Sequence, residues 1–261
     1  MTIYRPKYKV LDLFSGIGGF SLGLERTGGF ETTAFCEICP KARKVLSKHW
    51  ANVKQYTDIR ELTHEQLAKD GIGVDVITGG FPCQDISVAG KGKGIKAERS
   101  GLWSEMFRLI GDVRPTWAII ENVSALRSKG LTLVLQNLCE IGYMCEWHCI
   151  PASCAAIGAP HQRDRIWIMA NSISKSKRMH TPRTLHDWQP NDRQKRGTVG
   201  GFFAGLCQAS TKAAGHWEVE PNVGRVAHGI PKRVDRLKQL GNSVVPQIPE
   251  LIGNAILEVG A

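Results

Sequence analysis

The stretch VLDLFSGIGGFSLGLE, residues 10–25, decides the expected fold. Its apolar run ends at Phe14, glycines follow at positions 16, 18 and 19, and a helical pattern begins directly after them. Glycines let the backbone turn tightly and let a ligand approach it at the positively polarised start of a helix. The dinucleotide-binding pattern G-x-G-x-x-G is incomplete, because Ser21 stands at the position of its third glycine. On its own, this turn fits an ordinary strand-to-helix connection equally well.

The rest of the chain repeats the change from strand to helix. Short apolar runs predict strands, and amphipathic runs predict helices. We expect strands at residues 9–14, 32–35, 74–78, 117–120 and 166–170, and helices at residues 20–27, 40–48, 63–70, 104–113 and 131–141. This alternation predicts an α/β fold with a mostly parallel sheet, flanking helices and a ligand site at the carboxyl ends of the strands. The pattern fades after Asn171 and returns at residues 234–256, where one or two helices are expected to pack back on the first domain.

The composition is that of a globular protein with an excess of positive charge. Hydrophobic residues make up 42% and charged residues 22% of the chain, and the net charge is +10. This composition excludes a disordered chain. No run approaches the roughly 20 apolar residues of a membrane helix, and the first residues lack a secretory cleavage site, so a cytoplasmic protein is expected. Between residues 171 and 217, eight Lys or Arg stand against two Asp, which fits a phosphate-contacting surface or a solvated insertion.

The cysteine pattern argues against a metal site. Cys36 and Cys39 form a C-x-x-C, but no second such pair follows, and the other cysteines are irregularly spaced. A structural zinc site is closed by four ligands. Most of these thiols are better interpreted as small buried groups in a reducing compartment.

Two carboxylates follow the strands that come after the glycine turn. Glu37 lies 21 residues after Gly16, where an acidic side chain can bond ribose hydroxyls. Asp58, in YTDIRE, follows a third short strand and is placed to accept a hydrogen bond from an adenine amino group. A glycine turn and two carboxylates at successive strand ends suit a cofactor that contains adenosine. Either carboxylate alone is equally well explained by solvation at the surface.

A second group of residues lies at later strand ends. Cys83, in GGFPCQ, follows a buried strand, as a nucleophile would, although alone it better fits a half-buried structural cysteine. Glu121 ends the strand TWAIIENV at the same sheet edge. Arg163 and Arg165, in QRDRIWIMA, share one face of a strand because they are two residues apart. Arginines buried in this way seldom exist without an anionic or polar partner.

Taken together and in this order, the motifs resemble those of the cytosine-5 DNA methyltransferase family, in a compact bacterial or phage-type form. The resemblance is carried by DLFSGIGGF, FCE, TDI, GGFPCQ, ENV, QRDR and RLKQLGNSVVPQ, which span residues 12–247. It implies a Rossmann-like fold that uses S-adenosyl-L-methionine. It also divides the chain into a catalytic and cofactor-binding domain (1–170), a small basic target-recognition region (171–222) and a C-terminal segment (223–261).

The resemblance also implies roles for single residues. Cys83 would add to carbon 6 of cytosine, so that carbon 5 takes the methyl group. Glu121 would bond the amino group and ring nitrogen 3, Arg165 would bond the base carbonyl, and Arg163 would support the same pocket. Glu121 must carry a proton for this role; burial favours that proton and nearby arginines oppose it. The residues implied in cofactor binding are Phe14, Ser15, Gly16, Gly18, Gly19, Glu37, Asp58, Ile59, Pro82, Leu102, Asn242, Ser243 and Val244.

The implied substrate is double-stranded DNA with the target cytosine flipped out of the helix. Residues 85–100 are similar to the family's mobile catalytic loop, in which glycines act as hinges and lysines contact phosphates. The DNA-binding candidates are Gln84, Ser87, Lys91 and Lys93. A monomer is expected, in restriction–modification beside a restriction endonuclease, or in a phage or regulatory role.

Other interpretations stay open at this point. An RNA (tRNA) cytosine-5 methyltransferase would use the same scaffold, and phosphates would attract the basic region either way. A catalytically silent DNA-binding relative would keep the fold, but the presence of Cys83, Glu121 and Arg165 together argues against it. A nicotinamide-dependent dehydrogenase is disfavoured by the missing third glycine.

Overall fold

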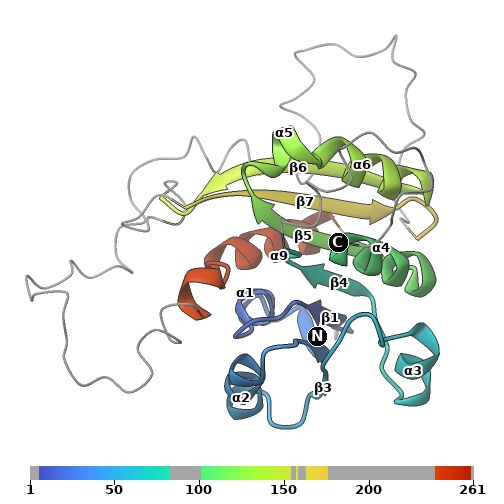
Figure 1. The fold of residues 1–261 in the computed structure, drawn as a ribbon, viewed down its shortest axis with the longest axis vertical. Helices are drawn as coiled ribbons and strands as arrows, with labels where there is room; N and C mark the ends of the chain where they lie inside the picture. The colour runs from blue at the N-terminus through green and yellow to red at the C-terminus, as the bar shows by residue number, and fades with distance from the viewer. Residues whose placement is uncertain (1–5, 83–100, 154–156, 158–162, 176–238, 260–261) are drawn as a thin grey trace, which may run out of the picture.

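A computed structural model describes residues 6–82, 101–153, 157, 163–175 and 239–259. These residues form a seven-stranded sheet in the order β3-β2-β1-β4-β5-β7-β6, with helices packed on it (Figure 1). The strands are β1 (Tyr8–Leu13), β2 (Phe30–Cys36), β3 (Lys54–Tyr56), β4 (Val76–Gly79), β5 (Trp117–Val123), β6 (Tyr143–Pro151) and β7 (Asp164–Ser172). The helices are α1 (Gly19–Arg26), α2 (Pro40–His49), α3 (His64–Lys69), α4 (Leu102–Val113), α5 (Leu126–Lys129), α6 (Leu131–Glu140) and α9 (Gln247–Val259). Among the described helices, none has both the length and the apolar character needed to cross a membrane.

Strand direction explains why functional side chains gather at one edge of the sheet. The strand pairs from β3 through β5 are parallel, whereas β7 runs antiparallel to both β5 and β6. The strand order reverses between β1 and β4, because the chain first builds outward to β3 and then returns to the other side of β1. In α/β sheets, ligands bind outside the carboxyl ends of the strands at such a reversal. The predicted mostly parallel α/β fold is therefore confirmed.

β6 is a strand that the sequence pattern did not predict. Its nine residues, YMCEWHCIP, mix apolar and polar side chains without alternation, and among them only Tyr143 and Ile150 are buried. β6 lies at the edge of the sheet and has β7 as its neighbour. Only two of its nine side chains are buried, so too few face the core to produce the two-residue period that marks a half-buried strand, which explains the missing signal.

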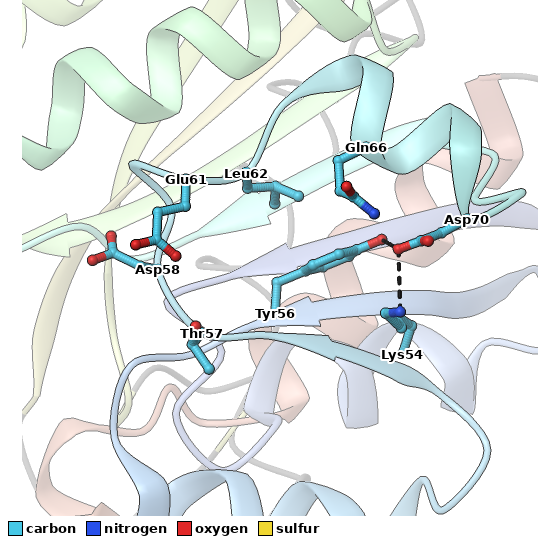
Figure 2. A pocket seen from close by; sticks show the side chains of 8 residues that line it. All are labelled: Lys54, Tyr56, Thr57, Asp58, Glu61, Leu62, Gln66 and Asp70. Atoms are coloured by element: carbon cyan, nitrogen blue, oxygen red, sulfur yellow. Dashed lines mark hydrogen bonds and ion pairs between the residues drawn. The ribbon is translucent and has the colours of Figure 1, made fainter.

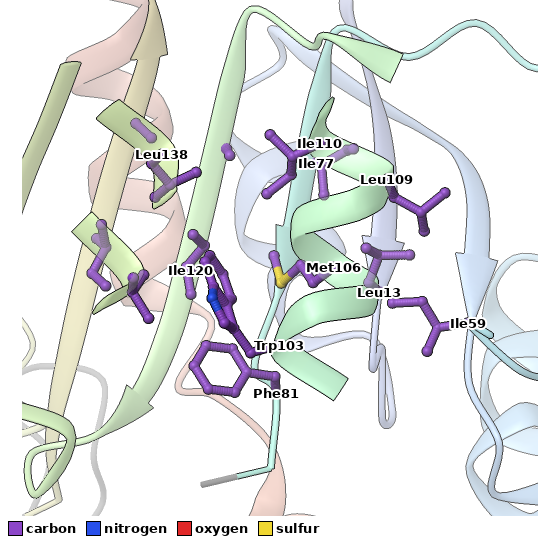
Figure 3. Packing of buried hydrophobic residues seen from close by; sticks show 14 of the residues in the cluster. Leu13, Ile59, Ile77, Phe81, Trp103, Met106, Leu109, Ile110, Ile120 and Leu138 are labelled. Carbon is purple, nitrogen blue, oxygen red and sulfur yellow. The ribbon is translucent and has the colours of Figure 1, made fainter. Parts of the chain in front are cut away.

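Hydrophobic clusters on both faces of the sheet hold the strand ends in place. On one face, α4 inserts Met106, Leu109 and other apolar side chains against β1, β4 and β5 (Figure 3). On the other face, α1 and α9 pack against the sheet and against each other. At Gly23 of α1, a Cβ would lie 2.1 Å from the carbonyl oxygen of Pro246, so only glycine permits this contact. The middle of α1 is thereby held against Pro246 and the first turn of α9.

Candidate active site

The turn after β1 has a conformation that few residues adopt. Phe14 has a φ of 51°, and the φ angles of Gly16 and Gly18 are 55° and 86°. A positive φ in a bulky residue such as Phe14 costs of order 1–3 kcal/mol and is concentrated at ligand sites. The hydroxyl of Ser15 donates to the carbonyl oxygen of Asp12, and the Gly18 N–H donates to the carbonyl oxygen of Ser15 over 2.8 Å. The predicted cofactor residues from 14 to 19 thus form one tightly bonded turn at the start of α1.

The carboxylate of Glu37 lies against this turn. Its Oε2 accepts a hydrogen bond from the Gly16 N–H (2.8 Å), and its Oε1 accepts one from the Cys39 N–H (2.7 Å). A carboxylate offers about four acceptor positions, so capacity remains for the hydroxyls of a ligand. The structure brings together the ends of β1 and β2, where the sequence placed the glycine turn and the ribose-binding candidate.

The segment before α9 reaches the same turn from the far end of the chain. A Cβ at Gly19 would lie 2.8 Å from both Ser243 Oγ and Val244 Cγ2, so these residues touch the backbone of the turn. Gln239 Nε2 also donates to Cys39 Sγ over 3.3 Å. Asn242, which was predicted for the same pocket, is exposed. The C-terminal segment therefore borders the cofactor turn.

A hollow of about 280 Å³ lies at the end of β3 (Figure 2). It is lined by Lys54, Tyr56, Thr57, Asp58, Glu61, Leu62, Gln66 and Asp70. In Figure 2, Asp58 and Glu61 lie together on one side, and Asp70 lies on the other, where it accepts a hydrogen bond from the Tyr56 hydroxyl (2.7 Å) and pairs with Lys54 (3.2 Å). All of the lining residues except Leu62 carry a polar group, and the adenine-binding candidate Asp58 is part of the wall.

Asp58 is bonded to a neighbour that the sequence analysis did not single out. Arg60 donates from Nε to Oδ1 of Asp58 (2.9 Å) and from Nη2 to Oδ2 (2.5 Å). These hydrogen bonds hold the pKa of Asp58 below its ordinary value, so the carboxylate is ionised and can only accept. The adjacent Ile59, another cofactor candidate, is 4% exposed and packs in the apolar cluster under α4 (Figure 3). A pair two residues apart in an irregular segment has no sequence signature, which is why Arg60 was missed.

The predicted catalytic carboxyl and arginine meet across two neighbouring strands. Arg165 Nε, on β7, lies 2.8 Å from Oε1 of Glu121, on β5, and the side chains are 24% and 11% exposed. Burial raises the pKa of Glu121 to about 6, while the charges of Arg165 and Arg163 act in the opposite direction. At neutral pH the carboxyl group of Glu121 is therefore mostly ionised, and a minor fraction of it is protonated.

Arg163 has a different environment. Its Nη1 lies 3.4 Å from the carbonyl oxygen of Leu240, a long hydrogen bond to the C-terminal segment. Its Nε is buried and has no hydrogen-bond partner in the described part of the chain. Burial lowers the pKa of the Arg163 guanidinium, and the nearby charge of Arg165 adds to this effect. Arg163 thus lies between the acid–arginine pair and the segment that borders the cofactor turn.

The chain that leads to Cys83 runs beside Glu121. A Cβ at Gly80 would lie 2.7 Å from Oε2 of Glu121, and Asn122 Nδ2 donates to the carbonyl oxygen of Phe81 over 2.9 Å. Pro82 follows and is exposed. Cys83 itself lies outside the described residues, as do Gln84, Ser87, Lys91 and Lys93, while Leu102, half-buried, begins α4 after the undescribed stretch. The carboxyl ends of β4 and β5 therefore meet at the side chain of Glu121.

The two halves of the site suit two different ligands. Backbone amides at the start of α1 and the carboxylates of Glu37 and Asp58 match the hydroxyl and amino groups of an adenosine. The pair of Glu121 and Arg165 offers an acceptor and a donor side by side, which matches the edge of a pyrimidine. A mostly parallel sheet that gathers such groups at adjacent strand ends defines a nucleotide-cofactor-binding α/β protein.

Comparison with known families shows to which family of nucleotide-cofactor-binding α/β proteins the chain belongs. The model of the family "C-5 cytosine-specific DNA methylase" matches residues 8–217. The chain belongs to this family.

Named relatives agree with that assignment, and solved structures show a similar fold. The chain is 38% identical to the Type II methyltransferase M2.BsuMI of Bacillus subtilis (strain 168), with 65% of this chain and 43% of the relative covered. It is 32% identical to the Type II methyltransferase M.CviJI of Paramecium bursaria Chlorella virus IL3A, with coverages of 71% and 50%. The chain thus spans about half the length of the curated relatives it matches. The fold is similar to a Spodoptera frugiperda DNMT2 mutant (TM-score 0.55, 22% identity, coverages of 68% and 56%) and to a putative DNA modification methyltransferase encoded within an Escherichia coli prophage (TM-score 0.53, 24% identity, coverages of 67% and 49%).

Proposed function

We propose that this protein is a DNA (cytosine-5-)-methyltransferase that modifies carbon 5 of a flipped-out cytosine in double-stranded DNA. The observation that carries the proposal is the ion pair of Glu121 and Arg165 beside the end of β4. Cys83 is the third residue after Gly80, whose backbone touches Glu121. A base held by the acid–arginine pair would thus lie next to the chain segment that carries a thiol.

The reaction proceeds by addition and elimination. The thiolate of Cys83 attacks carbon 6 of cytosine, which makes carbon 5 nucleophilic, and carbon 5 then takes a methyl group. A base removes the proton from carbon 5, and the carbon–sulfur bond breaks, which releases Cys83. Glu121 bonds the amino group and ring nitrogen 3, and Arg165 donates to the base carbonyl, so that both stabilise the charge that develops during attack.

The cofactor of the proposed reaction is S-adenosyl-L-methionine, whose sulfonium would supply the methyl group and leave as the neutral thioether S-adenosylhomocysteine. The turn of residues 14–19 would hold it at the start of α1, with Glu37 at its ribose and Asp58 at its adenine amino group. Ser243 and Val244 would close the pocket from the C-terminal side. What supports this assignment is the chemistry of these residues, since carboxylates accept hydrogen bonds from ribose hydroxyls and from an amino group.

The setting of the reaction belongs to the same proposal. Glycines and lysines at residues 85–100, including Lys91 and Lys93, would close over the DNA and contact its phosphates with Gln84 and Ser87. Residues 1–170 would form the catalytic domain, 171–222 the target-recognition region, and 223–261 the returning segment. The relatives named Type II methyltransferases favour a restriction–modification role beside an endonuclease. A location in the cytoplasm and action as a monomer are further parts of the proposal.

Duplex DNA that carries 5-fluorocytosine tests the proposal directly. Fluorine cannot leave as a proton does, so the covalent intermediate should accumulate as a protein–DNA adduct that survives denaturation. We expect the adduct with the wild-type chain and S-adenosyl-L-methionine, and none with Cys83→Ser, which should still bind S-adenosylhomocysteine. Cys139→Ser, an exposed thiol on α6, is the matched control and should form the adduct normally. Methyl transfer to tRNA but not to duplex DNA would overturn the proposed substrate.

A further inference from the structure

Asp12 is a fully buried carboxyl that the proposed reaction does not use. It lies on β1, and its side chain is bonded in two directions. Oδ2 accepts a hydrogen bond from the hydroxyl of Ser21 on α1 (2.8 Å), and Oδ1 accepts one from the hydroxyl of Thr78 on β4 (2.9 Å). Ser21 and Thr78 are also 0% exposed. A buried charge is costly to maintain, so a fully enclosed acid with two partners calls for an explanation.

The first contact replaces a missing helix cap. The N-cap of α1 is Gly18, which makes no side-chain capping hydrogen bond, and the first turn of α1 contains no acidic residue. Ser21 is the third residue of α1, and the carboxylate of Asp12 is bonded both to its hydroxyl and to its backbone N–H. An acid at this position does what a capping side chain does for the free amides of a helix start. Asp12 therefore supplies from β1 the cap that the glycine turn lacks, and this accounts for Ser21 at the third glycine position.

The second contact lies on the strand that leads to Cys83. Thr78 is the register partner of Asp12 in the parallel pair of β1 and β4. Gly79 and Gly80 come next, and the backbone of Gly80 touches Glu121. One carboxyl group thus bonds the helix that begins at the cofactor turn and the strand that enters the base pocket.

We propose that Asp12 is a positioning residue that couples the cofactor turn to the end of β4, so that displacement of either element displaces the other. This inference rests on the proposed function, because it concerns the relative placement of the cofactor and the nucleophile. Burial raises the pKa of Asp12 to about 7, which shows what the enclosure costs an ionised acid. Asparagine would keep the shape and one acceptor without that cost.

A double-mutant cycle tests the coupling. Ser21→Ala, Thr78→Val and the double variant are made in the wild-type chain and in Asp12→Ala, and affinity for S-adenosylhomocysteine is measured by calorimetry beside kcat and KM. In the wild type, we expect Ser21→Ala to weaken binding about fivefold and Thr78→Val to act mainly on kcat. We expect the effect of the double variant on affinity to differ at least about threefold from the product of the single effects, because contacting residues in one network do not act independently.

The Asp12→Ala background should abolish that departure, since the linking group is gone. Asp12→Asn should stay within about threefold of the wild type in affinity and kcat, because an amide can still bond both hydroxyls. Ser47→Ala, which removes an exposed hydroxyl from α2, is the matched control and should change nothing. Circular dichroism melting confirms that each variant is folded.

The possible failures can be told apart. If Asp12→Ala does not fold, the cycle in the wild-type chain and the Asp12→Asn variant still decide. The inference would be overturned if the effects of Ser21→Ala and Thr78→Val on affinity simply multiply in the wild-type chain. It would also be overturned if Asp12→Asn binds S-adenosylhomocysteine as weakly as a folded Asp12→Ala. A wild-type chain that binds no S-adenosylhomocysteine would refute the proposed function as well, whereas normal binding with multiplying effects would refute only this inference.

Discussion

Nε of Arg165 lies 2.8 Å from Oε1 of Glu121, and this ion pair joins the antiparallel neighbours β7 and β5 at the edge of the sheet. The pairing register sets Arg165 opposite Val123, two residues beyond Glu121, so both charged side chains project from the same face. If Arg165 turns to the carbonyl of a bound base, Glu121 loses its nearest cation. Its affinity for a proton then rises, which is what the proposed hydrogen bond from Glu121 to ring nitrogen 3 requires.

This relationship predicts what Arg165→Ala should do. Without the guanidinium, burial acts on the acid with less opposition, so we expect the pKa of Glu121 to rise above its value of about 6. Carbon-13 NMR titration of a glutamate-labelled chain without DNA measures this directly. The same variant should lower kcat/KM about 10²–10³-fold, as expected when one charge-stabilising donor is removed.

The matched control is Arg26→Ala, which removes an arginine from a surface ion pair with Glu250 (3.6 Å). It should leave both the titration and the kinetics unchanged. A Glu121 titration that is the same in Arg165→Ala and wild type would show that the pair does not set the acidity of Glu121.

A second prediction concerns stability and pH. The pKa of Glu121 rises from 4.5 to about 6 on folding, so the folded state binds more protons than the unfolded state between these values. Ionisation therefore destabilises the fold: the penalty is absent below pH 4.5, develops as pH rises, and is complete above pH 6. Glu121→Gln carries no such penalty. Urea unfolding measures the free energy of unfolding of the variant minus that of the wild type. We expect this difference to be about 2 kcal/mol more positive at pH 7.5 than at pH 4.5. An equal difference at both pH values would contradict the assignment.

The strand ends of the site were predictable because they depend on local patterns. The glycine turn with Gly16, and the spacing from it to Glu37, are written in consecutive residues, and the parallel topology then brings them together. The partners of these residues were not predictable. Arg60 binds Asp58 through an irregular segment, and Leu240 approaches Arg163 from 77 residues away. Such contacts depend on tertiary packing, which carries no period in the sequence.

β6 and Asp12 show two further limits of sequence patterns. β6 buries only two of its nine side chains, so the alternation that marks a half-buried strand is absent from its sequence. Asp12 stands in an apolar strand, where its charge would suggest exposure, yet it is fully enclosed. Its role becomes visible only when the hydroxyls of Ser21 and Thr78 are seen beside it. The role of Cys83, which lies outside the described residues, stays a prediction.

A third prediction concerns the contact of the C-terminal segment with the cofactor turn. Gly19→Ala would place a Cβ 2.8 Å from Ser243 Oγ and 2.9 Å from the Val244 carbonyl oxygen, closer than real Cβ contacts, so the segment must move. We expect affinity for S-adenosylhomocysteine to fall about tenfold or more, as measured by calorimetry. Gly111→Ala, in α4 with open space around it, is the matched control and should stabilise the chain by about 0.5–1 kcal/mol without changing affinity. If both variants bind equally well, the C-terminal segment does not form part of the pocket.

The final prediction separates the carboxylate of Asp58 from the arginine that holds it. Arg60 is 63% exposed, and exposed ion pairs contribute little, so Arg60→Ala should weaken S-adenosylhomocysteine binding by less than about fivefold. Asp58→Ala should weaken it at least about tenfold, because it removes a charged acceptor for the adenine amino group. S-inosylhomocysteine, which has an oxygen in place of that amino group, makes the comparison specific. The wild type and Arg60→Ala should bind it more weakly than the adenosyl compound, and Asp58→Ala should bind the two alike. If Asp58→Ala still discriminates between them, the amino group is recognised elsewhere, and the proposed role of Asp58 is wrong.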